Sequence, residues 1–148
     1  VFPVVIADET DQKIKRLAGK IDRVLVDAPC SGLGTLRRNP DLKWRQSPES
    51  VREMTLKQAN ILASASRLVK PGGHLVYATC SLIDDENEAV VDGFLASHPE
   101  FKRLSVGSEL TRQKIAIEDA GGEMLHLYPH RHATDAFFAA ILTRRAPK

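Results

Sequence analysis

Apolar residues occur along the chain in two patterns: short runs of β-branched and aliphatic residues, and longer segments with an apolar residue at every third or fourth position. The short runs predict strands at residues 4–6, 21–26, 74–79, 101–104 and 137–143. The helical spacing predicts one helix that begins at Pro48 and another that begins near Asp84. Strands that alternate with amphipathic helices are typical of an α/β fold with a mostly parallel sheet, and we expect a late antiparallel strand.

The helix that begins at Pro48 carries sequence signals at both ends. Ser47 is a typical N-cap residue, and proline is tolerated at the first helical position because its missing N–H would have no partner there. The segment Lys70–Gly73, with its proline and two glycines, is expected to end the helix. The predicted apolar face consists of Val51, Met54, Gln58, Ile61, Leu62, Ala65, Leu68 and Val69.

Length and composition indicate one ordinary domain. The 148 residues are enough for a hydrophobic core, and 43% hydrophobic with 27% charged residues excludes disordered, collagen-like and coiled-coil proteins. Two cysteines are too few for a disulfide framework and fit a reducing compartment. The sequence has no run of 18 apolar residues and no secretory signal pattern. We therefore expect a cytoplasmic protein without a membrane partner.

Basic residues gather in one segment. The formal net charge of +2 does not by itself indicate nucleic-acid binding, because attraction to phosphate depends on where the charges lie. In residues 37–45, however, only Asp41 opposes the basic side chains. This basic cluster is expected to contact phosphates and to offer an indole for base stacking; it comprises Arg37, Arg38, Lys43, Arg45 and Trp44. The alternative is a solvated basic loop that Leu42 and Trp44 anchor to the core.

Both cysteines directly follow predicted strands, Cys30 after Asp27-Ala-Pro and Cys80 after Ala78-Thr. Ligands of parallel α/β sheets bind outside the carboxyl ends of the strands, so the two thiols could meet there. Asp8 and Asp27 are expected at the same edge. The alternative for each cysteine is a small buried hydrophobic residue, the commonest role of a free cysteine.

Other kinds of site fit the sequence less well. Zinc needs about four ligands at recognisable spacings, and no Cys-x-x-Cys or His-x-x-x-His occurs, although His130, His132 and Asp135 could attract a metal. We expect a polar loop there and no metal. Ser31 lacks the Gly-x-Ser-x-Gly elbow of a serine hydrolase. Position 37 is arginine, so the third glycine of a dinucleotide-binding fingerprint is missing.

Several segments together resemble the Nop/Sun family of RNA 5-methylcytosine methyltransferases. The similarity spans about residues 4–145, and the pair of cysteine motifs at this separation is its most specific feature. In the terminal motif this chain has Ala136 where the family usually has glycine, which puts the shape of a tight turn in question. The matching segments are Asp27–Gly32, Val69–Gly73, Ala78–Ser81, Pro129–Phe138 and Arg37–Trp44, the last being similar to the bacterial members that modify 16S ribosomal RNA.

The resemblance implies an S-adenosylmethionine-dependent RNA cytosine-C5 methyltransferase whose substrate is 16S rRNA. It implies that Cys80 is the nucleophile that adds to carbon 6 of cytosine and that Cys30 serves the release step. DNA cytosine methyltransferases suggest the opposite roles, because their nucleophile lies in a Pro-Cys motif like that of Cys30. It places Asp27 and Asp8 against the cofactor; a strand-end cap and an Asx turn are the respective alternatives. Because a free thiol is largely protonated at neutral pH, we expect cations to assist the nucleophile, with Lys43 and Arg131 as candidates and Arg131 also as an RNA contact.

The same resemblance implies a partial class I, Rossmann-like methyltransferase fold that lacks its first strands. No Gly-rich loop after a strand, and no acidic residue after a second strand, precedes Asp8. We therefore expect residues 1–148 to be the C-terminal portion of a catalytic domain, without the N-terminal cofactor-binding half and without an RNA-binding domain. Such a segment alone should bind the cofactor weakly and transfer no methyl group. The alternatives are a family member that modifies tRNA or another RNA, and a non-catalytic RNA-binding segment.

Overall fold

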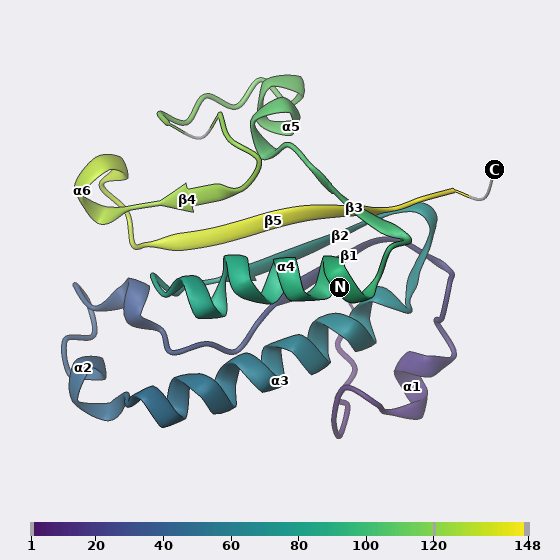
Figure 1. Cartoon of the computed structure of the whole chain (residues 1–148), viewed down its shortest axis with the longest axis horizontal. Helices are drawn as coiled ribbons and strands as arrows, with labels where there is room; N and C mark the ends of the chain where they lie inside the picture. Colours follow the sequence, from purple (N-terminus) through teal and green to yellow (C-terminus); the bar gives the residue numbers. More distant parts are fainter. Residues whose placement is uncertain (1, 120, 147–148) are drawn as a thin grey trace.

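A mixed five-stranded sheet forms the centre of the computed structural model, which describes residues 2–119 and 121–146 (Figure 1). The strands are β1 (Ile21–Asp27), β2 (Val69–Thr79), β3 (Phe101–Leu104), β4 (Leu125–Leu127) and β5 (Phe137–Arg144). The α-helices are α1 (Gln12–Lys15), α2 (Leu42–Arg45), α3 (Pro48–Ser66), α4 (Glu88–Ser97), α5 (Val106–Arg112) and α6 (Pro129–His132), and the 3-10 helices are η1 (Leu33–Thr35) and η2 (Asp84–Glu86).

The sheet has the order β1-β2-β5-β3, and β4 also pairs with β5. β1 and β2 are parallel, while β2, β3 and β4 each run antiparallel to β5. Four strands therefore share one direction and β5 alone is reversed. This arrangement confirms the expected α/β fold with a mostly parallel sheet and a late antiparallel strand.

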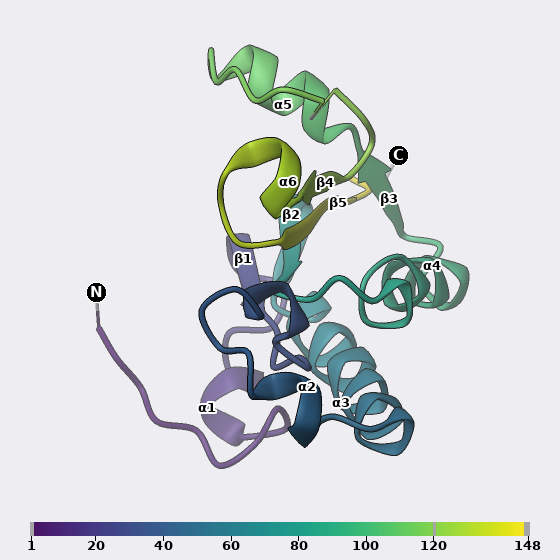
Figure 2. The ribbon, with the colours of Figure 1, turned by 90° about the vertical axis from the view of Figure 1, so that its left-hand side faces the viewer.

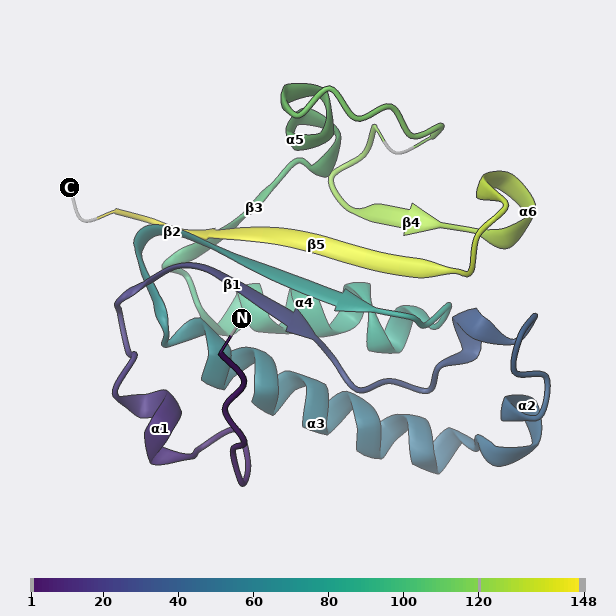
Figure 3. The ribbon, with the colours of Figure 1, turned by 180° about the vertical axis from the view of Figure 1, so that it is seen from behind.

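Helices α3 and α4 cover one face of the sheet (Figures 1 and 2). Ser47 caps α3 through its side chain, which accepts a hydrogen bond from the Ser50 N–H, and Pro48 is the first helical residue, as predicted. The core between helices and sheet includes Leu62 of α3, Phe94 of α4, and Tyr77 and Phe138 of the strands. On the opposite side no helix lies over β1 in Figure 3, and Leu25 of β1 is 69% exposed.

The segment Lys70–Gly73 belongs to β2 and is not the helix end predicted from its proline and glycines. α3 already ends at Ser66, and the β1–β2 register jumps from Ile21–Val69 to Arg23–His74. The extra residues loop out of the ladder, and Gly72 takes the left-handed backbone conformation there, with φ of 76°. Proline is compatible with such an irregularity because it has no N–H to leave unpaired.

Two further expectations differ from the structure. Residues 4–6 form no strand; Val4, Val5 and Ile6 are exposed, because this short apolar run finds no neighbouring strand to pair with. The acidic segment 84–86 forms the separate turn η2, and α4 begins only at Glu88. α5 is a helix that was not among those predicted, and Ser105 caps it.

In the part of the chain that the structure describes, no helix is both long enough and apolar enough to cross a membrane.

Candidate functional site

The two cysteines meet beyond the carboxyl ends of β1 and β2, with Cys30 Sγ 3.4 Å from Cys80 Sγ. Asp27 and Ala78 are partners in the parallel ladder, so each strand delivers its cysteine two or three residues farther on. Both cysteines are partly exposed and neither forms a disulfide. The thiols are therefore neither separated nor enclosed in the apolar core, which is the placement that a two-thiol site needs.

Burial raises the pKa of the Cys30 thiol to about 12, and the neighbouring Cys80 adds to the rise. A hydrogen bond from the Gly32 backbone acts in the opposite direction but does not cancel it. Cys30 therefore stays protonated at neutral pH and can donate its S–H to the Cys80 sulfur, whichever reaction that sulfur performs.

The raised pKa predicts an unusual pH dependence for alkylation of Cys30. Between pH 8 and 10.5 its rate of reaction with iodoacetamide should rise about tenfold per pH unit, because only the thiolate reacts and its fraction keeps growing below the pKa. Peptide mass spectrometry of the folded protein measures this rate. A rate that levels off near pH 9, as for an ordinary thiol, would contradict the assignment.

A buried carboxylate joins the two cysteine loops. Glu86 of η2 is fully buried, and its Oε1 accepts hydrogen bonds from the Ser31 N–H at 2.7 Å and from Gln58 Nε2 at 3.1 Å. Its Oε2 accepts from the Ser31 hydroxyl at 2.6 Å and from the Ser81 hydroxyl. Ser31 and Ser81 are the residues that directly follow Cys30 and Cys80, so one side chain contacts both loops.

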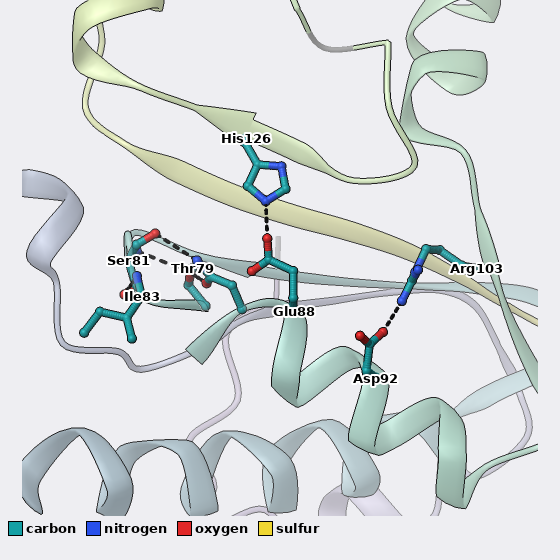
Figure 4. A network of polar contacts seen from close by, with 8 residues as sticks. Thr79, Ser81, Ile83, Glu88, Asp92, Arg103 and His126 are labelled. Carbon is teal, nitrogen blue, oxygen red and sulfur yellow. Dashed lines mark hydrogen bonds and ion pairs between the residues drawn. The ribbon is translucent and has the colours of Figure 1, made fainter. Parts of the chain in front are cut away.

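The backbone around Glu86 is also tied to β2. The Tyr77 hydroxyl donates to the Glu86 carbonyl at 2.7 Å, and the Asn87 amide donates to the Ser81 carbonyl at 3.1 Å. Thr79 Oγ1 donates to Asn87 Oδ1 at 2.5 Å and accepts from the Ser81 N–H (Figure 4). In the same view Glu88 of α4 points to His126 of β4, and Asp92 points to Arg103. Polar contacts thus fix the position of η2 and α4 against the strands.

Gly34 passes between the Cys80 loop and the start of β5. Its N–H donates to the Cys80 carbonyl at 2.9 Å, and its carbonyl accepts from the Ala136 N–H at 3.0 Å. A Cβ at Gly34 would lie 2.6 Å from the Cys80 carbonyl oxygen and 2.7 Å from that of Ala136. Ala136 itself is buried and is not among the described residues with positive φ, so the alanine that departs from the family pattern fits this turn without backbone strain.

The two aspartates expected near the cofactor lie apart. Asp27 is exposed at the carboxyl end of β1, on the same edge as the cysteines. The expectation that Asp8 shares this edge is wrong: its neighbour Glu9 is contacted by Ser64, close to the end of α3 and to the start of β2 (Figure 3). Asp8 instead forms the Asx turn, accepting from the Thr10 hydroxyl and N–H at 2.7 Å each, and these hydrogen bonds lower its pKa.

The arginines that are expected to contact RNA form ion pairs with acidic neighbours. Arg37 and Arg38 both pair with Asp135, whose side chain is only 11% exposed, and Arg131 pairs with Asp119 at 3.3 Å. Trp44 is 81% exposed, so it does not anchor its loop to the core, whereas the partly buried Leu42 lies beside Gly32. The Lys43 ammonium lies 4.9 Å from the centre of the Trp44 ring. The contact of these residues with RNA stays a prediction.

Among the described residues, neither a group of metal ligands nor the groove between α3 and α4 includes the two cysteines. Within the described residues no three His, Cys, Asp or Glu side chains are grouped as metal ligands, and both ring nitrogens of His132 contact the backbone. A groove of about 1000 Å³ lies between α3 and α4, lined by residues such as Val51, Thr55 and Phe94. Neither cysteine lines this groove.

Sequence reasoning missed Glu86 and Gln58 as parts of the site. Glu86 follows two other acidic residues, which suggests a charged helix start, while Gln58 falls on the apolar face of α3 and is nevertheless fully buried. A polar residue on an apolar face is the signal that could have revealed this contact, because a buried amide needs hydrogen-bond partners.

Comparison with known proteins gives a consistent result. The family model described as 16S rRNA methyltransferase RsmB/F matches residues 3–143. A probable ribosomal RNA small subunit methyltransferase B of Synechocystis is 42% identical over 137 residues, which are 93% of this chain and 30% of that protein. The ribosomal RNA small subunit methyltransferase B of Klebsiella pneumoniae is 44% identical over 128 residues, 85% of this chain and 27% of that protein. The chain thus spans less than a third of these relatives.

Solved structures show the same relationship. NSun6 from Pyrococcus horikoshii, solved with SFG, superposes with a TM-score of 0.75 and 29% identity, over 99% of this chain and 35% of that one. A methyltransferase homologue from the same organism gives a TM-score of 0.66 and 28% identity, over 89% and 41% of the two chains. The fold is therefore that of part of a Rossmann-like methyltransferase domain. The chain belongs to the 16S rRNA methyltransferase RsmB/F family, as its resemblance to the Nop/Sun enzymes predicts.

Proposed function

We propose that this chain carries the reacting residues of an S-adenosylmethionine-dependent methyltransferase that acts on carbon 5 of a cytosine in 16S rRNA. The observation that carries the proposal is the 3.4 Å distance between the sulfurs of Cys30 and Cys80 beyond two parallel strands. Cytosine carbon 5 is a weak nucleophile, so its methylation needs a group that adds to carbon 6. A second acid or base beside that group then serves the later steps, and paired thiols meet both needs.

In this mechanism the Cys80 thiolate forms a bond to cytosine carbon 6, and the electron pair displaced onto carbon 5 takes up the methyl group. A base then removes the proton from carbon 5, and the carbon 6–sulfur bond breaks to return the thiolate. The elevated pKa of Cys30 supports its part, because a thiol that stays protonated can donate a hydrogen bond to the Cys80 sulfur as that bond breaks.

The cofactor is implied by the family, and SFG, present with one solved relative, is an analogue of S-adenosylmethionine. When bound, S-adenosylmethionine supplies the methyl group. Of the two expected contacts, only Asp27 lies on the edge with the cysteines, where its exposed carboxylate is available to a polar ligand. We propose that Asp27 contacts the cofactor or the target base, and we assign no such role to Asp8.

RNA is the expected substrate because the target base must be unstacked before a thiolate can reach carbon 6. Bases in RNA loops are exposed in this way more often than bases in duplexes. The exposed Trp44 with Lys43 beside its ring supports a base-stacking role on the surface that also carries Arg37 and Arg38. We propose that this basic cluster and Arg131 bind the RNA.

The product of the reaction tests the proposal. The full-length protein that contains this segment is incubated with 16S rRNA and methyl-labelled S-adenosylmethionine, and the digested RNA is analysed by chromatography with mass spectrometry. We expect label in 5-methylcytidine, with tRNA as the control substrate. Label in another nucleoside would overturn the assignment to cytosine carbon 5, and preferential labelling of tRNA would overturn the substrate.

The basic cluster gives a separate prediction. Replacing Arg37 and Arg38 together by alanine should weaken RNA binding and flatten its dependence on salt, because fewer counterions are released from the phosphates. Asp135 competes for both arginines, so Asp135→Asn should strengthen binding in the same assay. Filter binding at several salt concentrations measures both effects, with Arg112→Ala on α5 as the control. An unchanged salt slope in the double variant would remove these arginines from the RNA contact.

A further inference from the structure

We infer that Glu86 is the positioning residue that holds Cys30 and Cys80 together as a pair. Its role in methyl transfer rests on the proposed function, but its effect on the distance between the sulfurs does not. Glu86 is fully buried, lies on η2 outside both cysteine motifs, and contacts neither sulfur among the hydrogen bonds described. Its action would therefore pass through the residues next to the cysteines.

Glu86 accepts hydrogen bonds from both cysteine loops. Ser31 gives it both its N–H and its hydroxyl, and Ser81 gives it its hydroxyl. The two hydroxyl oxygens are themselves only 3.3 Å apart, because both approach Oε2. Since each serine follows its cysteine directly, fixing the serines side by side also fixes the sulfurs side by side.

Gln58 of α3 completes the arrangement. Its Nε2 donates to Glu86 Oε1 at 3.1 Å and to the Pro29 carbonyl at 2.9 Å, and Pro29 directly precedes Cys30. Together with the serines it gives the carboxylate four donors, which matches the acceptor capacity of its two oxygens. A buried carboxylate with all its acceptor sites used holds its neighbours in one geometry, because breaking any contact leaves a polar group without a partner.

Two substitutions of Glu86 distinguish a role of its hydrogen bonds from a role of its negative charge. Glutamine at position 86 keeps the length of the side chain and one acceptor oxygen, and serine hydroxyls can turn to accept from its amide. Alanine removes all four contacts. A positioning residue should therefore be replaced in large part by glutamine and not by alanine, whereas a residue that acts through its charge would lose its effect in both variants.

Phenylarsine oxide tests the distance between the sulfurs without RNA or cofactor. Its arsenic bonds to two nearby thiols, and its oxygen leaves as water with the two thiol protons. In the full-length protein, protection of Cys30 and Cys80 from later alkylation is followed by peptide mass spectrometry. We expect capture at least tenfold slower in Glu86→Ala, within threefold of wild type in Glu86→Gln, and unchanged in Asp85→Ala, the control at the exposed neighbouring position of η2.

Methyl transfer by the same variants completes the test. Glu86→Ala should lower kcat at least a hundredfold with little change in KM for RNA, while Glu86→Gln should retain kcat within tenfold. If Glu86→Ala reacts with phenylarsine oxide as fast as wild type, the inference is overturned. It is also overturned if Glu86→Gln loses kcat but reacts normally with phenylarsine oxide, because that result indicates a role of the negative charge. If Glu86→Ala does not fold, Ser81→Ala, which removes one donor, should slow capture severalfold, and normal capture there would overturn it. Failure of wild type to methylate RNA with normal capture would count against the proposed function alone.

Discussion

Cys80→Ala in the full-length protein is expected to abolish methylation without any covalent product, whereas Cys30→Ala should accumulate a covalent complex with RNA. The first variant lacks the sulfur that adds to carbon 6, so the reaction cannot begin. The second retains that sulfur but lacks the S–H that lies 3.4 Å from it, so addition and methyl transfer proceed and release is slow. Losses of at least a thousandfold in turnover are expected for both.

Denaturing gel electrophoresis with labelled RNA measures the complex, and peptide mapping identifies the cysteine attached to the base. The double variant Cys30→Ala/Cys80→Ala is the matched control and should give no complex. A complex that accumulates with Cys80→Ala in place of Cys30→Ala would reverse the two roles. Complete turnover by either single variant would remove that thiol from the mechanism.

Gly34→Ala should lower both the stability of the protein and the rate of methyl transfer. The new methyl group would lie 2.6 Å and 2.7 Å from two backbone oxygens, those of Cys80 and Ala136, so the backbone has to move. Overpacking of this kind costs about 1–3 kcal/mol of unfolding free energy. Because one of the displaced atoms belongs to Cys80, we also expect methyl transfer to fall roughly a hundredfold, the usual effect of misplacing a reacting group by about 1 Å.

Thermal unfolding of the full-length protein, followed by circular dichroism, measures the loss of stability, and the methylation assay measures the loss of rate. Gly93→Ala is the control, since a Cβ at this position in α4 meets no atom within 4 Å and alanine favours a helix. It should unfold at the same or a higher temperature. Equal stability and activity of the two variants would show that the contact of Gly34 with the Cys80 loop has no energetic weight.

Local sequence patterns predicted those elements whose signals lie within the element itself. Ser47 and Pro48 locate the start of α3 because capping involves only neighbouring residues. The apolar runs locate β1, β2 and β5 because residues of these strands, such as Val26, Tyr77 and Leu142, are buried in the hydrophobic core. The run at 4–6 looks the same but forms no strand, since a strand also needs a partner that no local pattern can reveal.

The site, too, was predictable only where its residues are placed by local sequence patterns. The cysteines follow recognisable strands, so their meeting could be expected from the rule on carboxyl ends, and the short distance between the sulfurs agrees with it. Asp8 was misplaced because its position depended on the strand that does not form. Glu86 resembles its exposed neighbours Asp84 and Asp85 in sequence, and only the tertiary packing turns it inward.

The register of β1 against β2 has a consequence for how such sites vary between proteins. Asp27 pairs with Ala78, and the cysteines follow at fixed short offsets, so the distance between the sulfurs depends on the spacing of adjacent strands and not on the 49 residues between the cysteines. The intervening chain leaves the edge, passes through α3 and returns. Insertions at its exposed tip near Asn39 and Pro40 would lengthen the gap and leave the sulfurs in place. Related sites in distant sequences should therefore be sought by strand-end position, with the number of residues between the cysteines left variable.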